Sequence, residues 1–302
     1  RRGFSYFFHC RSCGYEMKCE HCSVSLTYHK SSGKMVCHYC GYSRDPVQVC
    51  PDCGSLDVGY SGFGTERIEE EVARRFPKLR TARVDTDSVR KKGVLEKTLA
   101  EFRDGNIDIL LGTQMVAKGL NFPKVKLVGI VLADSSLNVP DFRSPERTFS
   151  LIVQVSGRAG RYTNDGRVII QTFKPRNPAI ADAAEGELER YYRDELLMRK
   201  ELGFPPFFRL FRVVFRGREA DKVRTRADKA AAALREAGLE ETEILGPASC
   251  PIEVIARNYR RHIIIRTLRY GEVHRMLRRW AQEESGPNGT FREIDPDPVN
   301  LL

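Results

Sequence analysis

The chain has 302 residues, of which 50 are Lys or Arg and 40 are Asp or Glu, so its formal net charge at pH 7 is +10. This length is enough for two domains with hydrophobic cores plus a small extra module, because single domains usually hold roughly 100 to 200 residues. No apolar run reaches the roughly 20 residues that a bilayer-spanning helix needs. The basic excess, with a pI of about 9.2, favours a polyanionic partner such as nucleic acid.

Cysteine dominates the first part of the chain. After a basic and aromatic lead at Arg1 to Phe8, which is expected to be β-like, eight of the nine cysteines form four CxxC pairs. Two cysteines separated by two residues can place both thiolates on one tetrahedral metal ion, and a following glycine suits the positive φ of a zinc knuckle. Eight thiolates are enough for two closed, structural four-cysteine zinc sites. The pairs are Cys10/Cys13, Cys19/Cys22, Cys37/Cys40 and Cys50/Cys53.

Two other uses of these cysteines compete with zinc binding. A disulfide framework is typical of small secreted domains, but this chain shows no signal peptide and is long enough to build a core. A redox protein of the thioredoxin type needs one reactive pair rather than four. Four knuckles can share two ions in three ways, and the 14 residues between Cys22 and Cys37 favour a nested arrangement. His21 and His38 are expected to be surface residues, because eight thiolates already fill both sites.

Strands and helices alternate after the cysteine-rich segment. Thr65 is a suitable N-cap, and acidic residues early in the helix that follows, with arginines late, complement the helix dipole. Apolar strands alternating with amphipathic helices predict an α/β lobe with a mostly parallel sheet, a fold that binds nucleotides at the carboxyl ends of its strands. The expected helices are 65–76, 94–102 and one from 144 toward 161, and the expected strands are 79–84, 107–111, 125–133 and 166–173.

A smaller domain is expected beyond a linker and one long helix at 180–202. Its order of elements, β-α-β-β-α-β, predicts a two-layer α+β sandwich. The expected strands are 210–215, 252–256, 262–267 and 291–294, and the expected helices are 218–237 and 272–280.

The run QVSGRAGR at a helix end resembles motif VI of superfamily-two helicases. Two guanidiniums about one helical turn apart can reach the β- and γ-phosphates of ATP and stabilise the charge that develops as the bond breaks. The alternative is a basic helix end bound to local carboxylates. The candidate catalytic residues are Arg158 and Arg161, and Gln154, Gly157 and Gly160 complete the nucleotide site.

The run GTQMVAKG resembles motif V of the same superfamily, which follows a strand and connects the DNA backbone to the nucleotide site. Thr113 and Gln114 are the candidate DNA contacts in this motif, because hydroxyl and amide groups at a strand end bind phosphates well. Lys118 and Gly119 are assigned to the nucleotide site.

These motifs occur together with the paired zinc knuckles and with the runs GFGTE, LAD, DFRSPER and DPDP. The combination resembles the PriA family of primosomal replication-restart helicases over essentially the whole chain. The resemblance implies a bacterial, cytoplasmic and nucleoid-associated monomer that recognises stalled forks, binds single-stranded DNA and unwinds DNA 3′ to 5′ with ATP and Mg²⁺. It also implies single-strand DNA-binding protein and primosome and helicase-loading proteins as partners. For the two Zn²⁺ ions it implies Cys10, Cys13, Cys50 and Cys53 on one, and Cys19, Cys22, Cys37 and Cys40 on the other.

The sequence contains no GxxxxGK[ST] phosphate-binding loop, and Asp134, which ends a strand as a Walker B aspartate does, is followed by Ser135. Together with the start at Arg1, this predicts a fragment without the first motor lobe that does not hydrolyse ATP alone. The expected domains are the start of the second RecA-like helicase lobe (1–9), a two-zinc insertion (10–54), the rest of that lobe (55–178), a linker and helix (179–206) and a C-terminal α+β domain (207–302).

Eight arginines fall between Arg257 and Arg279, near aromatic residues that could stack on bases. The candidate DNA contacts are Arg257, Tyr259, Arg260 and Arg261, with Arg260 and Arg261 forming one phosphate-contacting turn. A solvated surface is an equally weighted alternative, since charge runs are usually solvated. A zinc-ribbon scaffold of the primosome without enzymatic activity is the alternative function.

Overall fold

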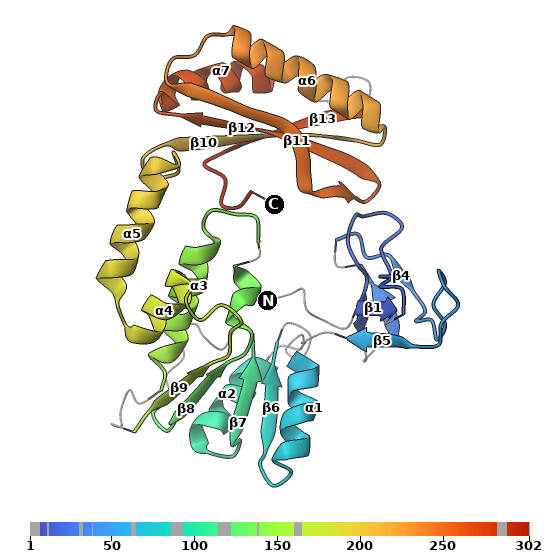
Figure 1. Ribbon diagram of the computed structural model, residues 1–302, viewed down its shortest axis with the longest axis vertical. Helices are drawn as coiled ribbons and strands as arrows, with labels where there is room; N and C mark the ends of the chain where they lie inside the picture. Colours follow the sequence, from blue (N-terminus) through green and yellow to red (C-terminus); the bar gives the residue numbers. More distant parts are fainter. Residues whose placement is uncertain are drawn as a thin grey trace.

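The structure is a computed structural model that describes residues 7–10, 12–29, 33–37, 39–61, 65–85, 93–113, 122–137, 139–159, 165–282 and 289–301. It has three parts: a cysteine-rich module, an α/β lobe and a C-terminal domain joined to the lobe by a helical linker (Figure 1). Within the described ranges, no helix has both the length and the apolar character needed to cross a membrane.

The cysteine-rich module is closed at its base by two strands. Strand β1 (Phe7–Cys10) pairs antiparallel with β5 (Val58–Ser61), so the chain enters and leaves the module at one place. Between them, β2 (Thr27–His29), β3 (Lys34–Val36) and β4 (Ser43–Arg44) form an antiparallel sheet. The module has its own small core of buried side chains, made by Phe8, Met17, Leu26 and Met35 together with Cys19, Cys22 and Cys37.

The α/β lobe contains two pairs of parallel strands. Strand β6 (Thr81–Val84) pairs with β7 (Ile109–Gly112), and β8 (Leu127–Ile130) pairs with β9 (Arg167–Ile170). The helices are α1 (Thr65–Arg75), α2 (Val94–Asp104) and α3 (Ser144–Ser156), with a short 3₁₀ helix, η1 (Ala133–Ser136). The expected parallel α/β arrangement is confirmed.

Several of the expected elements in this lobe are shorter than predicted, among them β9, which ends at Ile170, and one further strand and one helix. The strand expected at 125–133 ends at Ile130, because Leu132 has a left-handed backbone (φ 51°) and η1 begins directly after it. Helix α3 ends at Ser156, where Gly157 caps it, so it does not continue toward Arg161.

The prediction of a single long helix at 180–202 is wrong, because the structure has two helices there. Helix α4 (Pro178–Glu185) begins at Asn177, whose side chain accepts a hydrogen bond from the Ala179 N–H, and ends at Gly186. Gly186 has φ +78°, a conformation that glycine adopts without strain and that stops a helix. Helix α5 (Leu188–Glu201) then runs to the C-terminal domain (Figure 1).

Helices α3, α4 and α5 share one core. Ala179, Ile180 and Tyr191 pack with Phe149 and Ile152 of α3. The rings of Phe149 and Tyr191 are stacked with centroids 3.9 Å apart. The helix that precedes QVSGRAGR is therefore packed against the helices that lead to the C-terminal domain.

The C-terminal domain is a two-layer sandwich, as its pattern predicted. Strands β10 (Arg209–Gly217), β11 (Thr242–Ile255), β12 (Asn258–Thr267) and β13 (Thr290–Pro296) form an antiparallel sheet in the order β11-β12-β10-β13. Helices α6 (Ala220–Glu236) and α7 (Tyr270–Gln282) cover one face (Figure 1). The sheet contributes Phe211, Val213, Phe215, Ile263 and Ile265 to the core, and the helices contribute Val223, Ala227, Leu234, Val273 and Leu277.

A buried ion-pair network joins α5 to the start of α3. The Arg199 guanidinium, on a residue that is 9% exposed, donates to Glu146 of α3 (2.7 Å) and to Glu195 of its own helix (2.8 Å). We expect Arg199→Met to lower the free energy of unfolding by about 3 kcal/mol or more, because buried Glu195 would lose its positively charged partner and keep only the hydrogen bond from the Tyr191 hydroxyl. Urea denaturation measures this change, and adding Glu195→Gln should restore part of it. A loss below about 1 kcal/mol would show that the network does not hold the helices together.

Candidate metal centres and the motif VI helix

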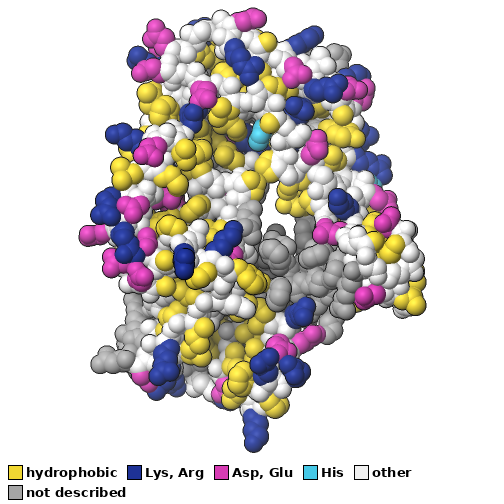
Figure 2. All heavy atoms as spheres, viewed as in Figure 1, with side chains coloured by type: hydrophobic (Ala, Val, Ile, Leu, Met, Phe, Trp, Pro, Cys, Tyr) yellow, Lys and Arg dark blue, Asp and Glu magenta, His cyan; other side chains and the backbone are white. Residues whose placement is uncertain are grey.

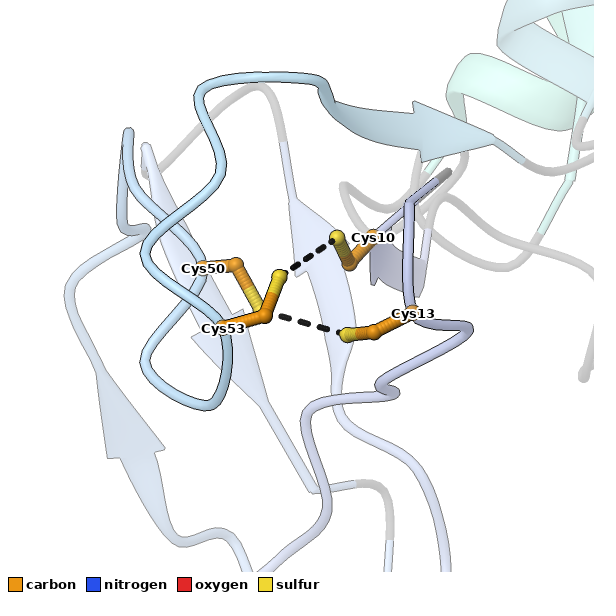
Figure 3. A group of neighbouring side chains, drawn as sticks. All are labelled: Cys10, Cys13, Cys50 and Cys53. Atoms are coloured by element: carbon orange, nitrogen blue, oxygen red, sulfur yellow. Dashed lines mark hydrogen bonds between the residues drawn. The ribbon is translucent and has the colours of Figure 1, made fainter.

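The first cysteine group draws together two knuckles that are distant in the sequence. Cys10 ends β1 and Cys13 lies in the turn that follows it, whereas Cys50 and Cys53 come from the loop before β5. All four sulfur atoms are turned toward one another (Figure 3). The Sγ atoms of Cys10 and Cys53 are 3.6 Å apart, and those of Cys13 and Cys50 are 3.7 Å apart. Cys13 and Cys53 are exposed, so one side of this group faces solvent.

The second cysteine group lies inside the core of the module. It joins Cys19 and Cys22 to Cys37 and Cys40, and the Sγ atoms of Cys19 and Cys40 are 3.6 Å apart. Three of its four cysteines are buried. The structure thus has the nested grouping that loop length favoured and that the family resemblance implied.

Backbone turns of one kind shape the knuckles. In the first, the Gly14 N–H donates to the Cys10 carbonyl (2.9 Å), and Gly14 has φ +78°. Gly41 and Gly54 make the same bond to Cys37 and Cys50, at φ +75° and +71°. These positive φ angles explain the glycine that follows three of the four CxxC pairs.

The sulfur geometry fits zinc and excludes disulfides. Four thiolates about 2.3 Å from a tetrahedral Zn²⁺ stand about 3.8 Å from one another, whereas bonded sulfurs are about 2.05 Å apart. All ligand atoms within each group lie within 4.8 Å of one another. The two groups therefore support two zinc ions. His21 adds no ligand: its ring lies against Tyr42 (centroids 4.9 Å apart) and hydrogen-bonds Arg257, and His38 lies outside the described residues.

Helix α3 holds the start of the QVSGRAGR run. Gln154 lies in its last turns, Gly157 follows its end, and the Arg158 N–H closes a turn on the Val155 carbonyl (3.0 Å). Thr148, Phe149 and Ile152 are buried and fix the helix on the lobe. Gly160 and Arg161 lie outside the described residues.

The second helicase-like run follows β7. Thr113 comes directly after the strand, at its carboxyl end, as the resemblance to motif V predicted. Gln114, Lys118 and Gly119 fall in 114–121, which the structure does not describe.

Asp134 is a structural carboxylate. It is 6% exposed and accepts hydrogen bonds from the Thr172 hydroxyl (2.7 Å) and from the N–H groups of Phe173 (2.9 Å) and Lys174 (3.1 Å). Burial would raise the pKa of Asp134, but the hydrogen bonds from Thr172 and Phe173 outweigh it, so the pKa is lowered. These bonds tie η1 to the segment after β9, which explains an aspartate here without Walker B chemistry.

The expectation that Arg260 and Arg261 share one turn is wrong. Both lie within β12, where neighbouring side chains point to opposite faces of the sheet, and the turn itself is formed by Ala256 and Arg257. The Arg260 guanidinium donates to the Ile252 carbonyl, and the Arg261 guanidinium donates to the Pro247 carbonyl, both at 3.2 Å. One phosphate cannot bridge this pair from a single side of the sheet.

The other candidate DNA contacts of this hairpin have different surroundings. Tyr259 is 39% exposed, whereas the Arg257 side chain binds His21 of the cysteine-rich module (2.7 Å). Burial and the charges of Arg212, Arg260 and Arg261 lower the pKa of His262 to about 4, so this histidine is neutral at pH 7. Figure 2 shows basic and acidic side chains interspersed on the face in view, without one continuous basic stripe.

Sequence reasoning missed the contacts between the cysteine-rich module and the hairpin of β11 and β12. The Val254 N–H donates to the Ser23 hydroxyl (2.9 Å) across 231 positions of sequence. The Ala256 N–H donates to the Cys22 sulfur (3.2 Å). No local pattern in either segment indicated this pairing.

The fold and the two cysteine groups define a class: a helicase C-terminal lobe that carries a zinc-binding module. Comparison with known families agrees. Residues 63–163 match the helicase conserved C-terminal domain, 19–44 match the PriA DNA helicase Cys-rich region domain, and 200–299 match the primosomal protein N C-terminal domain. The chain belongs to the PriA family and contains these three of its domains.

Individual relatives align along the entire chain. Each is a replication restart protein PriA: that of Treponema pallidum is 49% identical over 302 residues, that of Bacillus subtilis 42% over 305, and that of Synechocystis 40% over 306. In each case 100% of this chain is covered, but only 46%, 38% and 36% of the relative. The chain spans less than half the length of these relatives.

Proposed function

We propose that the chain is part of an ATP-dependent 3′-5′ DNA helicase that recognises stalled replication forks and initiates primosome assembly for replication restart. The observation that carries this proposal is the QVSGRAGR run at the end of α3, in a parallel α/β lobe whose chain also carries both cysteine groups. The family match supports it, because the relatives are named replication restart proteins.

The nucleotide chemistry is assigned to the residues around the end of α3. Arg158 and Arg161 stabilise negative charge on the phosphates as the terminal bond breaks, and Gln154, Gly157, Gly160, Lys118 and Gly119 line the same site. ATP with Mg²⁺ requires a second lobe with a phosphate-binding loop, since no GxxxxGK[ST] run occurs in these 302 residues. The chain's part of the reaction is therefore to complete a site that the other lobe begins.

DNA contacts are assigned to two parts of the chain, the α/β lobe and the C-terminal domain. Thr113, which directly follows β7, is assigned to a backbone phosphate, together with Gln114 beside it in sequence. In the C-terminal domain, exposed Tyr259 suits base stacking. Arg260 and Arg261 supply positive charge from opposite faces of β12, and Arg257 supplies it from the turn before that strand. Single-strand DNA-binding protein and primosome and helicase-loading proteins are the proposed partners of a monomer.

The zinc ions have a structural role in this proposal. Each group offers four thiolates, which fill a tetrahedral coordination sphere and leave no open position for a substrate or a water nucleophile. In this proposal zinc binding stabilises the fold of the cysteine-rich module, and ATP hydrolysis takes place at the motor lobe.

A forked DNA with a 3′ single strand tests the function. The full-length protein should unwind this fork with ATP, whereas residues 1–302 alone should show no DNA-stimulated ATP hydrolysis, because they lack the phosphate-binding loop. The control is full-length protein with ADP in place of ATP. ATP hydrolysis by residues 1–302 would contradict the division of the site between two lobes. Fork binding by the full-length protein without unwinding would favour the alternative, a zinc-ribbon scaffold.

A further inference from the structure

The two cysteine groups differ in what surrounds them. Among the described residues, the sulfurs of the first group, Cys10, Cys13, Cys50 and Cys53, receive no hydrogen bond from the C-terminal domain. The second group does: the Ala256 N–H, at the tip of the β11–β12 hairpin, donates to the Cys22 sulfur with N and S 3.2 Å apart. Figure 1 shows the hairpin reaching down from its sheet to the cysteine-rich module.

Three further hydrogen bonds fix the hairpin on the same knuckle. The Ser23 N–H donates to the Val254 carbonyl (3.0 Å), and the Val254 N–H donates back to the Ser23 hydroxyl (2.9 Å). The Arg257 N–H donates to the His21 carbonyl (2.7 Å). Knuckle residues on both sides of Cys22 are therefore bonded to the hairpin, so the Cys22 sulfur cannot shift without disturbing it.

Side chains reinforce this backbone pairing. The Arg257 guanidinium hydrogen-bonds the His21 ring (2.7 Å), which in turn packs against Tyr42 of the module. Ile255 packs against the module's own core, the one that contains Cys19, Cys22 and Cys37. The hairpin thus covers the second cysteine group with apolar contact as well as polar bonds.

The turn at the tip has an unusual backbone that produces this contact. Ala256 (φ 50°) and Arg257 (φ 62°) are both left-handed, in a two-residue turn between the paired residues Ile255 and Asn258. Such turns favour Asn and Gly, since other residues are strained there. Here the left-handed pair aims two successive N–H groups at the knuckle, and the Asn258 side chain supports the turn by donating to the Ala256 carbonyl (3.0 Å).

We infer that the hairpin tip is an outer part of the second zinc site, so that zinc retention by this site and docking of the C-terminal domain on the module are coupled. A backbone N–H that donates to a metal-bound thiolate stabilises its negative charge and fixes its direction toward the metal. Undocking removes this donor from Cys22, and loss of zinc removes the knuckle shape that holds the hairpin. The coupling is reciprocal, because both changes belong to one thermodynamic cycle.

The coupling distinguishes the two metal ions functionally. Among the described residues the first group receives no hydrogen bond from the C-terminal domain, so we expect it to hold its zinc whether or not that domain is docked. The second group, through its bond to the hairpin, keeps the C-terminal domain docked on the cysteine-rich module. The position of the C-terminal domain relative to the module then depends on one zinc ion and not on the other.

Cysteine alkylation in the full-length, zinc-loaded protein tests the inference, with mass spectrometry to identify each labelled cysteine. Replacing residues 254–259 by Asn-Gly closes the hairpin above the module and removes all of these contacts. We expect alkylation of Cys19, Cys22, Cys37 and Cys40 in the presence of a chelator to become at least about tenfold faster, since loss of an outer hydrogen bond typically weakens metal binding 10- to 100-fold. The cysteines of the first group should keep their rate.

Two matched variants control this experiment. The double substitution Ala256→Asn, Arg257→Gly keeps both backbone N–H groups in a favourable turn and removes the Arg257 side chain with its bond to His21. It should therefore accelerate alkylation far less than the shortened hairpin. Ser249→Ala, which removes a hydroxyl bonded to Glu253 of the same strand, should leave the rates unchanged. Equal acceleration by the double substitution would overturn the assignment to the backbone N–H groups.

Hydrogen exchange tests the reverse direction of the coupling. Removing zinc from the unaltered protein should raise amide exchange in residues 252–260, while residues 263–267 of the same sheet stay protected by their own core. Unchanged exchange at 252–260 after zinc loss, or an unchanged alkylation rate in the shortened variant, would overturn the inference even if every variant folds normally.

Discussion

Replacing Arg161 with Ala in the full-length protein should lower its ATP turnover by about 10³-fold or more, as removal of an arginine finger does in other nucleoside triphosphatases. Arg158→Ala should also lower turnover, because both arginines belong to the same QVSGRAGR run. The physical reason is charge: the phosphate oxygens gain negative charge in the transition state, and a positioned guanidinium stabilises it more than water can. Steady-state ATP hydrolysis with saturating single-stranded DNA measures the loss.

The matched control is Arg167→Ala, which removes an exposed arginine of β9 in the same lobe. It should leave turnover within about twofold of the unaltered protein, since nothing assigns Arg167 to the nucleotide site. DNA affinity, measured by fluorescence anisotropy, should change little in any of the three variants, because their effect is expected on phosphate chemistry and not on DNA. Near-normal turnover in Arg161→Ala would exclude its assigned role, and an equal loss in Arg167→Ala would point to a general effect on folding.

Much of the architecture follows from local patterns. The CxxC spacing with glycine after three pairs predicted the knuckles, and Gly14, Gly41 and Gly54 have the positive φ that this spacing requires. The alternation of apolar strands and amphipathic helices predicted the parallel lobe, and the β-α-β-β-α-β order predicted the C-terminal sandwich. In each case the structure is determined by neighbours within a few residues or by the burial of one periodic face.

Three errors in the bounds of elements share a cause, which is a change of backbone direction at one residue. Gly186 divides a helical pattern that otherwise runs from α4 to α5. Left-handed Leu132 prevents β8 from continuing beyond Ile130 along its apolar run. The strand expected at 252–256 begins ten residues earlier, at Thr242. Gly246 and Pro247 lie at a shift of register in this first part of β11 and interrupt the alternating pattern that predicts a strand. A single left-handed or irregular residue outweighs the propensities of the residues around it.

Contacts between distant segments could not be predicted from the sequence. Arg257 was assigned to DNA because it begins an arginine-rich segment, yet its side chain binds His21 of the cysteine-rich module. Composition identifies a residue's charge but not the group that its side chain binds, which depends on how the domains pack. The same limit applied to Asp134, whose position after a strand resembled Walker B until its three hydrogen-bond donors were known.

Replacing Cys37 with Ser in the full-length protein should remove one of the two zinc ions and unfold much of the cysteine-rich module. Cys37 is 1% exposed and lies in the module's core with Phe8, Leu26 and Met35, so the metal and the apolar side chains form one cooperative unit. Structural zinc contributes on the order of 10 kcal/mol of apparent folding free energy in small zinc domains, far more than so small a core provides. Metal analysis should give one zinc per chain, and hydrogen exchange should rise across 17–44.

Cys250→Ser is the control, because Cys250 is the one cysteine of the chain outside the two groups. It is buried in the C-terminal domain, where the Arg212 guanidinium lies 4.0 Å from its sulfur. This variant should keep both zinc ions and full protection of the module. The C-terminal domain should stay folded in Cys37→Ser, because its core of Phe211, Val213 and Ile263 contains no metal ligand. Two zinc ions in Cys37→Ser, or unchanged exchange across 17–44, would show that the metal does not hold the module together, and the fold of the module would then have to rest on its strands alone.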